Sequence, residues 1–180
     1  AVLREQIRSA AVDLAWIPAL QKDSRSRNAH ASTAIEGNPL TLEQVRALEE
    51  GRSLAASDQR SEREVINYFA GLRFIERHAE IQRVCHEDIF ELHRILAGDV
   101  MDQGQAGKYR TIQVRVGNHI PPPAGNVSAL MMELLDWWNN ESAELPPILS
   151  SAILHYRFEE IHPFADGNGR TGRAMSLWDL

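Results

Sequence analysis

One short segment near the C-terminal end of the sequence brings together side chains that can do chemistry. It reads His162-Pro163-Phe164-Ala165-Asp166-Gly167-Asn168-Gly169-Arg170-Thr171-Gly172-Arg173. Glycines at positions 167 and 169 allow backbone conformations in which successive N–H groups converge on an anion. A helix that begins directly afterwards adds the positive end of its dipole. We therefore predict a phosphate-binding cradle in this segment.

Four side chains of the same segment extend this prediction to catalysis. Arg170 and Arg173 lie on the first turn of the expected helix, so both guanidinium groups can reach one polyphosphate. Asp166 supplies the carboxylate oxygen that Mg²⁺ prefers when it also binds nucleotide phosphates. His162 is then free to take a proton from a hydroxyl, because an imidazole is the usual general base near neutral pH. A helix end followed by a plain turn would explain one such residue, but not the whole set.

The elements that must position this segment have the apolar period of amphipathic helices. We expect helices at residues 2–20, 24–36, 41–50, 61–75, 87–97, 127–139 and 148–161, and a last one from Arg170. Pro18 should disturb the first helix, and Thr41 with Gln44 should form a capping box at the third. The last helix reaches Leu180 without a cap, so we expect the natural chain to continue.

Residues 107–123 have a different period. Apolar Ile112, Val114 and Val116 alternate with polar residues, and Gly117-Asn118 can turn the chain back. The three prolines that follow remove backbone donors, so the second strand should be short and lie at an edge. The sequence therefore predicts a mainly α domain with one small β-hairpin.

Composition limits the class of protein. The chain has 180 residues, 43% hydrophobic and 24% charged, and one cysteine, Cys85, which predicts one globular domain without an internal disulfide. It shows neither an apolar run long enough for a membrane span nor a signal peptide, so we expect a cytoplasmic protein. The net charge of -6 does not indicate nucleic-acid binding, and any phosphate site must be local, where Arg157, Arg170 and Arg173 flank the glycine-rich turn.

The segment from His162 to Arg173 resembles the signature of the Fic family, His-Pro-Phe-x-Asp/Glu-Gly-Asn-Gly-Arg-x-x-Arg, at every fixed position. The resemblance implies a Fic-fold helical bundle that transfers the AMP part of ATP to a Ser, Thr or Tyr hydroxyl of a target protein. It implies that His162 deprotonates the hydroxyl, that Asp166 holds Mg²⁺, and that Phe164 anchors the segment in the core. The residues that it implies for binding the phosphates are Gly167, Asn168, Gly169, Arg170 and Arg173.

A second stretch, Ser32-Thr33-Ala34-Ile35-Glu36-Gly37-Asn38, fits the inhibitory signature Ser/Thr-x-x-x-Glu-Gly/Asn of Fic proteins that carry their inhibitor before the core. Ser32 and Glu36 share one helix face at this spacing. The resemblance implies that Glu36 pairs with Arg173 and so occupies a group that the γ-phosphate needs. An exposed polar helix that ends at Gly37 is the simpler interpretation of the pattern alone.

The predicted hairpin resembles the Fic flap, which lies over the active site and pairs with an extended target segment. Its candidate target-binding residues are Ile112, Gln113, Val114, Arg115 and Val116, although a plain surface hairpin fits them as well. We expect an N-terminal helical region at residues 1–50 with the inhibitory helix at about 24–36. A core at residues 51–180 should hold the flap and the catalytic loop, residues 162–173.

Several alternatives stay open at this point. Gly169 argues against the related Doc-type kinases, which have lysine there, whereas transfer of UMP or phosphocholine remains compatible with the motif. The same site could remove AMP from a modified protein, or the chain could be a regulatory ATP-binding module with little turnover. A self-AMPylating chain and a homo-oligomer are also compatible with the sequence.

Overall fold

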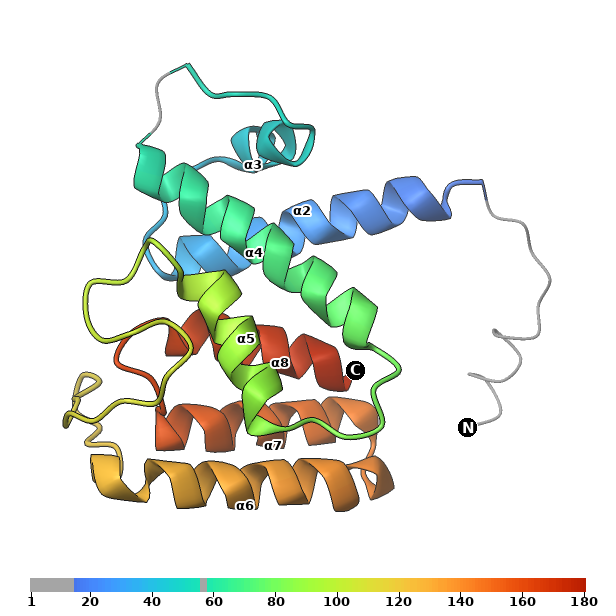
Figure 1. Ribbon diagram of the computed structural model, residues 1–180. Coiled ribbons are helices and arrows are strands. Elements are labelled where there is room, and N and C mark those ends of the chain that lie inside the picture. The colour runs from blue at the N-terminus through green and yellow to red at the C-terminus, as the bar shows by residue number, and fades with distance from the viewer. Residues whose placement is uncertain (1–14, 56–57) are drawn as a thin grey trace.

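The computed structural model describes residues 15–55 and 58–180, which fold into a helical bundle (Figure 1). The helices in chain order are α2 (Ile17–Ile35), α3 (Leu42–Glu49), α4 (Gln59–His78), α5 (His86–Ala97), α6 (Val127–Asn140), α7 (Pro147–Ile161) and α8 (Asn168–Asp179). Two short 3-10 helices, η1 (Ala124–Asn126) and η2 (Ser142–Glu144), flank α6. The mainly helical prediction is therefore confirmed.

Three helices at the C-terminal end form the frame of the bundle. α7 packs against both α6 and α8, and the three are stacked in Figure 1. α4 contacts α5 and α8, and α2 packs on α3 and α4 and reaches α8. The long loop between α5 and α6 lies at the end of the frame where α7 stops and α8 begins (Figure 1). This arrangement brings α2, α5 and the loop to the segment that carries the predicted chemistry.

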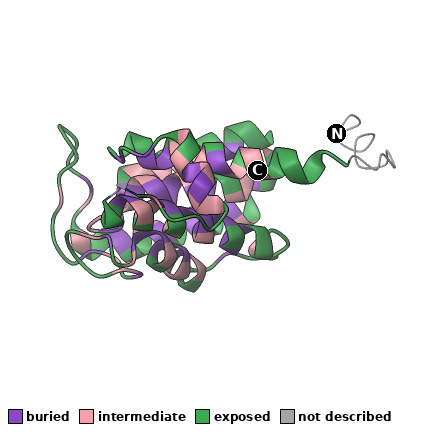
Figure 2. Ribbon diagram, turned by 90° about the horizontal axis from the view of Figure 1, so that it is seen from above, coloured by how far each residue is buried: buried purple, intermediate pink, exposed green. Residues whose placement is uncertain are grey.

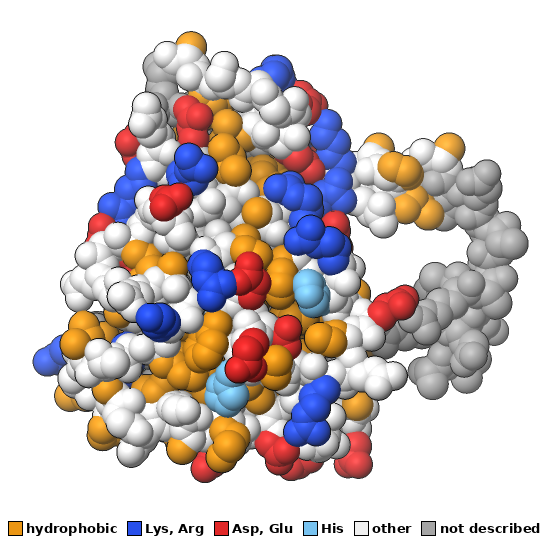
Figure 3. Space-filling model, viewed as in Figure 1, with side chains coloured by type: hydrophobic (Ala, Val, Ile, Leu, Met, Phe, Trp, Pro, Cys, Tyr) orange, Lys and Arg blue, Asp and Glu red, His pale blue; other side chains and the backbone are white. Residues whose placement is uncertain are grey.

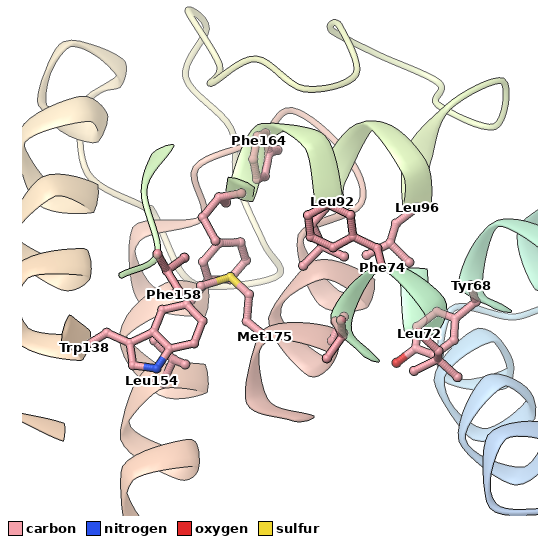
Figure 4. Close-up of a cluster of buried hydrophobic side chains, with 14 of the residues drawn as sticks. Tyr68, Leu72, Phe74, Leu92, Leu96, Trp138, Leu154, Phe158, Phe164 and Met175 are labelled. Carbon is pink, nitrogen blue, oxygen red and sulfur yellow. The ribbon is translucent and has the colours of Figure 1, made fainter. Parts of the chain in front are cut away.

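The apolar faces of these helices meet in one core, seen as the buried interior in Figure 2. Leu92 of α5, Phe158 of α7 and Met175 of α8 are fully buried in it, and so is Phe164 of the segment between α7 and α8 (Figure 4). Burial of a phenylalanine side chain stabilises the fold by roughly 1.5–3 kcal/mol. Phe164 therefore fixes the middle of the catalytic loop to the core.

Most predicted helix ends agree with the structure. The α3 capping box is present: the Gln44 N–H donates to the Thr41 hydroxyl at 3.3 Å, and the Thr41 N–H donates to the Gln44 side chain at 2.8 Å. α4 begins earlier than predicted, because Asp58 and not Ser61 is its N-cap and accepts the Ser61 N–H at 3.2 Å. The prediction for residues 2–20 lies largely outside the described residues. The predicted separation between this helix and the one at residues 24–36 is wrong, because α2 is continuous from Ile17 to Ile35. Pro18 lies in its first turn, where a backbone N–H would have no partner within the helix.

The predicted β-hairpin at residues 107–123 is also wrong. Residues 15–55 and 58–180 contain no strand, and the segment has one isolated antiparallel bridge between Val116 and His119, around the expected turn. The prolines lack N–H groups, and side chains take the place of a backbone ladder. Gln113 Nε2 donates to the Pro121 carbonyl at 2.8 Å, and Arg110 Nη2 donates to the Pro122 carbonyl at 2.6 Å. We call residues 107–123 the flap loop from here on.

Arg110 holds the flap loop against the catalytic loop. Its side chain is buried, and Nε donates to the His162 carbonyl at 2.8 Å while Nη1 donates to the Ile112 carbonyl at 3.0 Å. Its backbone N–H donates to the Pro163 carbonyl at 2.8 Å. Hydrogen bonds from a charged donor are the stronger kind, so this one residue fixes where the two loops meet.

Basic and acidic side chains are interspersed on the face seen in Figure 3, consistent with the net charge of -6. Within the part of the chain that the structure describes, every helix is too short or too polar to cross a membrane.

Replacing Arg110 with methionine tests its role in the fold. We expect Arg110→Met to lower the free energy of unfolding by about 2–4 kcal/mol, because several buried carbonyls lose a charged donor. Arg115→Met is the matched control, since Arg115 is an exposed arginine of the same loop and should change stability by less than about 0.5 kcal/mol. Urea denaturation measures both, and equal stability of the two variants would contradict the assignment.

Candidate active site at the start of α8

The catalytic loop reverses the chain between two antiparallel helices. His162 ends α7 in the left-handed conformation (φ 49°, ψ 63°), and its N–H donates to the Phe158 carbonyl at 2.9 Å. Gly167 precedes α8 with φ 79°, a value that glycine adopts without strain. A Cβ there would also lie 3.1 Å from the Ala97 side chain. The N–H groups of the first turn of α8 therefore face the loop, as an anion site requires.

Asn168 braces the inside of the loop. Its side chain is buried, with Oδ1 accepting the Phe164 N–H at 2.8 Å and Nδ2 donating to the Phe164 carbonyl at 2.9 Å. The amide thus satisfies both backbone groups of the residue that anchors the loop. Nδ2 has a second hydrogen that these two bonds do not use.

Asp166 lies at the mouth of this turn. Oδ1 accepts the Gly167 N–H at 2.6 Å and Oδ2 accepts the Asp102 N–H at 3.0 Å, so each carboxylate oxygen keeps a further lone pair. No group of three or more His, Cys, Asp or Glu side chains that could hold a metal occurs among the described residues. One carboxylate is nevertheless enough for Mg²⁺ that is also bound by substrate phosphates. The residues present fit Mg²⁺ in that form.

Arg170 is a buried cation with unused donors. Its side chain is 6% exposed, and the nearest carboxylates, those of Asp166 and Glu64, are 3.8 and 3.9 Å away. Neither Nε nor Nη1 has a hydrogen-bond partner among the described residues. Buried donors without hydrogen-bond partners are unfavourable unless a ligand reaches them. This arrangement is suited to a phosphate group.

Glu64 of α4, which the sequence did not single out, links this cation to the N-terminal region. Glu64 Oε2 accepts the Asn38 amide at 2.9 Å, and Asn38 also donates to the Ser61 carbonyl at 2.9 Å. The segment that follows α2 is therefore tied to the helix beside Arg170.

Arg173 is held by the end of α2. Its Nε donates to the Ser32 hydroxyl at 2.8 Å, one Nη2 bond reaches the Ser32 carbonyl at 3.0 Å, and another reaches Glu36 Oε1 at 2.5 Å. Tyr68 of α4, fully buried, shares a side-chain hydrogen bond with Ser32. Burial raises the pKa of the Tyr68 hydroxyl, so it stays neutral in this contact.

The Glu36 carboxylate also occupies the space above the first turn of α8. A Cβ added at Gly169 would collide with Glu36 Oε1 and lie 3.0 Å from Arg173 Nη1. Glycine at this position therefore lets the carboxylate lie directly against the helix N-terminus. An anionic ligand of that N-terminus would meet the negative charge of Glu36 at the same place.

His162 opens onto a cavity of about 350 Å³ whose lining also includes Val116, His119 and Tyr156. Its side chain is 16% exposed, and Nδ1 lies 3.4 Å from Glu159 Oε2. His119 Nε2 is 3.2 Å from the Glu160 carbonyl, which brings the flap loop against α7. The imidazole of His162 is thus accessible from the cavity beside Val116 and His119 of the flap loop.

His93 of α5 holds the catalytic loop through hydrogen bonds and ring stacking. The Gly107 N–H donates to Nδ1 at 2.8 Å, so the proton is on Nε2, which donates to the Asp166 carbonyl at 2.9 Å. The ring stacks on Phe164, with centroids 3.6 Å apart and planes at 8°. Burial lowers the pKa of His93 from 6.5 to about 4, so the ring is neutral in the fold. In the sequence, the apolar neighbours of His93 indicate a core residue and give no sign of its contact with the catalytic loop.

Other predicted residues are not part of this group. Arg157, which flanks the turn in the sequence, instead lies over the Trp137 ring at 5.4 Å on the face towards α6. Of the five candidate residues at 112–116, only Val116 lines the cavity beside His162, and Arg115 bonds within the loop, to the Gly117 carbonyl at 2.9 Å.

Fold and site together define a helical domain in which a buried arginine lies beside a helix N-terminus, an arrangement suited to an anion. Residues 83–180 match the model of the Fic/DOC family, and the chain belongs to this family. A protein adenylyltransferase Fic from Drosophila willistoni is 36% identical over 86% of this chain, and protein adenylyltransferase fic-1 from Caenorhabditis elegans is 40% identical over 80%. The crystal structure of a Fic family protein from Desulfovibrio desulfuricans superposes with a TM-score of 0.80 and 39% identity, covering 92% of this chain and 50% of that one.

These relatives are longer than the sequence described here. The matched region covers 32% of the Drosophila protein and 29% of the nematode protein, about a third of each. The region that matches the family model, residues 83–180, includes the catalytic loop.

The neutral state of His93 predicts a pH dependence of stability. The pKa of His93 in the fold, about 4, is below its ordinary value of 6.5. The contribution of neutral His93 to the free energy of unfolding is therefore complete above pH 6.5 and is lost as the pH falls from 6.5 to 4. This contribution is about 3 kcal/mol at most. His93→Phe should keep the stack on Phe164, lose both hydrogen bonds and show a flatter stability profile over this range. Urea denaturation at several pH values measures it, and parallel profiles would contradict the assignment.

Proposed function

We propose that the chain is a protein adenylyltransferase that transfers AMP from ATP to a hydroxyl side chain of a target protein. The observation that carries the proposal is Arg170, a buried guanidinium with unused donors beside a helix N-terminus. The names of the Drosophila and nematode relatives support the same activity.

ATP binds at the N-terminal end of α8. The backbone at Gly167 and Gly169, with the free amide hydrogen of Asn168, receives the α-phosphate, and Arg170 and Arg173 receive the β- and γ-phosphates. When bound, Mg²⁺ would lie at Asp166 and offset charge on the phosphates. Phosphoryl chemistry depends mainly on such positioning and charge neutralisation.

His162 is the general base of the transfer. The target hydroxyl oxygen forms a bond to the α-phosphorus, the bond from that phosphorus to the bridging oxygen of pyrophosphate breaks, and the hydroxyl proton passes to the imidazole. The cavity that includes Tyr156 and Val116 leaves room for the target side chain on the solvent side of His162. The flap loop residues 112–116 would face the target segment, as an irregular loop and not as a strand. The described residues do not identify the target, and self-modification is its simplest substitute in an assay.

The end of α2 restrains this activity. The three hydrogen bonds that the Arg173 side chain donates go to Ser32 and Glu36. The Glu36 carboxylate also lies over Gly169. ATP that enters must therefore either displace Glu36 or bind without Arg173. Loss of the Glu36 side chain frees the guanidinium and removes a negative charge from the cradle.

The test compares the parent chain, Glu36→Gly, and Glu36→Gly with His162→Ala after incubation with Mg²⁺ and ATP. We expect Glu36→Gly to gain about 329 Da, the mass of an AMP group, at least about tenfold faster than the parent, because a charged pair of roughly 1.5–3 kcal/mol is removed. The double variant should gain nothing. Intact-mass spectrometry measures each.

Glu43→Gly serves as the charge-matched control, since Glu43 is an exposed carboxylate at the start of α3. It should modify itself at the rate of the parent. A gain of about 80 Da would indicate a kinase instead. Equal rates for Glu36→Gly and the parent would contradict the proposed restraint.

A further inference from the structure

Glu159 of α7 lies next to the catalytic histidine and is the acidic side chain that approaches its ring. Oε2 is 3.4 Å from His162 Nδ1, one helical turn along the chain. This distance is slightly longer than an optimal hydrogen bond, as is common for catalytic pairs before substrate binds. The sequence motif of the catalytic loop begins at His162, so it does not include this residue.

The other oxygen of Glu159 is enclosed. Oε1 is buried without a hydrogen-bond partner among the described residues, and His155 Nε2 is 3.8 Å from it. A Cβ added at Gly172 would lie 2.7 Å from Oε1, so the backbone of α8 closes directly over the carboxylate. A carboxylate partly withdrawn from water in this way is stabilised by a nearby donor or positive charge. The imidazoles of His162 and His155 are the groups that can supply one.

The remaining groups around His162 act elsewhere. Arg110 donates to the backbone carbonyl of His162 and not to its ring. His119 is directed to the Glu160 carbonyl. Tyr156 shares the cavity and is 67% exposed. Glu159 is therefore the carboxylate that lies beside Nδ1 of the His162 ring.

We propose that Glu159 is a positioning residue, which holds His162 as the Nδ1–H tautomer with the Nε2 lone pair available for the target hydroxyl. The inference rests on the proposed function for its role in catalysis. The proton taken from the hydroxyl goes to Nε2, and the carboxylate stabilises the imidazolium that results until solvent removes the proton. A carboxylate on the far nitrogen of a histidine base commonly has this function.

Two variants separate the hydrogen bond from the charge. Glu159→Met keeps the size of the side chain and removes the acceptor, whereas Glu159→Gln keeps an acceptor oxygen and removes the charge. In the Glu36→Gly background we expect Glu159→Met to lower the self-AMPylation rate at saturating ATP by roughly 10- to 100-fold, with a smaller loss for Glu159→Gln. The ATP concentration for half-maximal rate should change by less than about twofold, because Glu159 does not contact the phosphate cradle.

Glu133→Gln is the control for net charge, as Glu133 is an exposed residue of α6, and its rate should equal that of the background. Thermal unfolding shows whether each variant is folded. A rate for Glu159→Met equal to that of Glu133→Gln would overturn the role in catalysis.

Nitrogen NMR of the histidine rings tests the tautomer without any turnover. With ¹⁵N-histidine in alkaline buffer and His162→Ala for assignment, the two nitrogens of a neutral ring report which one is protonated. We expect His162 to be protonated on Nδ1 in the parent and in Glu159→Gln, and to shift towards Nε2–H in Glu159→Met. An Nε2–H ring in the parent, or an unchanged tautomer in Glu159→Met, would overturn the proposal. If Glu36→Gly does not modify itself, the proposed function loses its support, while the NMR result still decides the role of Glu159.

Discussion

The site depends on holding a tight loop between two antiparallel helices, so that α8 begins directly where the loop ends. Phe164 is the anchor: its side chain is buried in the core and its backbone is closed by Asn168. His93 adds a ring stacked on Phe164 and a bond to the Asp166 carbonyl. Because backbone groups cannot be left without partners inside a protein, these contacts allow a loop of this shape to exist at all.

Two arginines of α8 have guanidinium groups that an anionic ligand could bind. Arg170 is buried with unused donors, and Arg173 is occupied by groups from α2 and not by groups of its own loop. Such an arrangement stores electrostatic free energy at the helix N-terminus, which an incoming anion can recover. Glu36 pairs with Arg173, whereas Glu64 of α4 lies near Arg170. In the proposed function, the restraint and the binding of ATP both involve Arg173, so a change in the position of α2 would alter ATP binding.

The sequence predicted much of this because the motif is local. Spacing within residues 162–173 predicted a base, a carboxylate and two arginines in one short segment, and capping signals predicted α3. The pairing of Glu36 with Arg173 followed from the resemblance, but other residues that act across long separations were not predictable. His93, Glu64 and Arg110 reach the loop only through the packing of α4, α5 and α8. The hairpin failed for a related reason. Its alternation was correct for a strand, but the prolines lack the N–H donors of a ladder, and the Arg110 side chain donates to the Ile112 and Pro122 carbonyls.

In the proposed function, the first turn of α8, with Arg170, binds the phosphates of ATP. Calorimetric titration of Mg²⁺ and ATP into Glu36→Gly, with and without Arg170→Leu, tests it most directly. The account predicts binding by Glu36→Gly and a dissociation constant roughly 10- to 100-fold higher after loss of the guanidinium, the equivalent of about 1.5–3 kcal/mol for a charged hydrogen-bonded contact. Equal dissociation constants for two folded variants would contradict it.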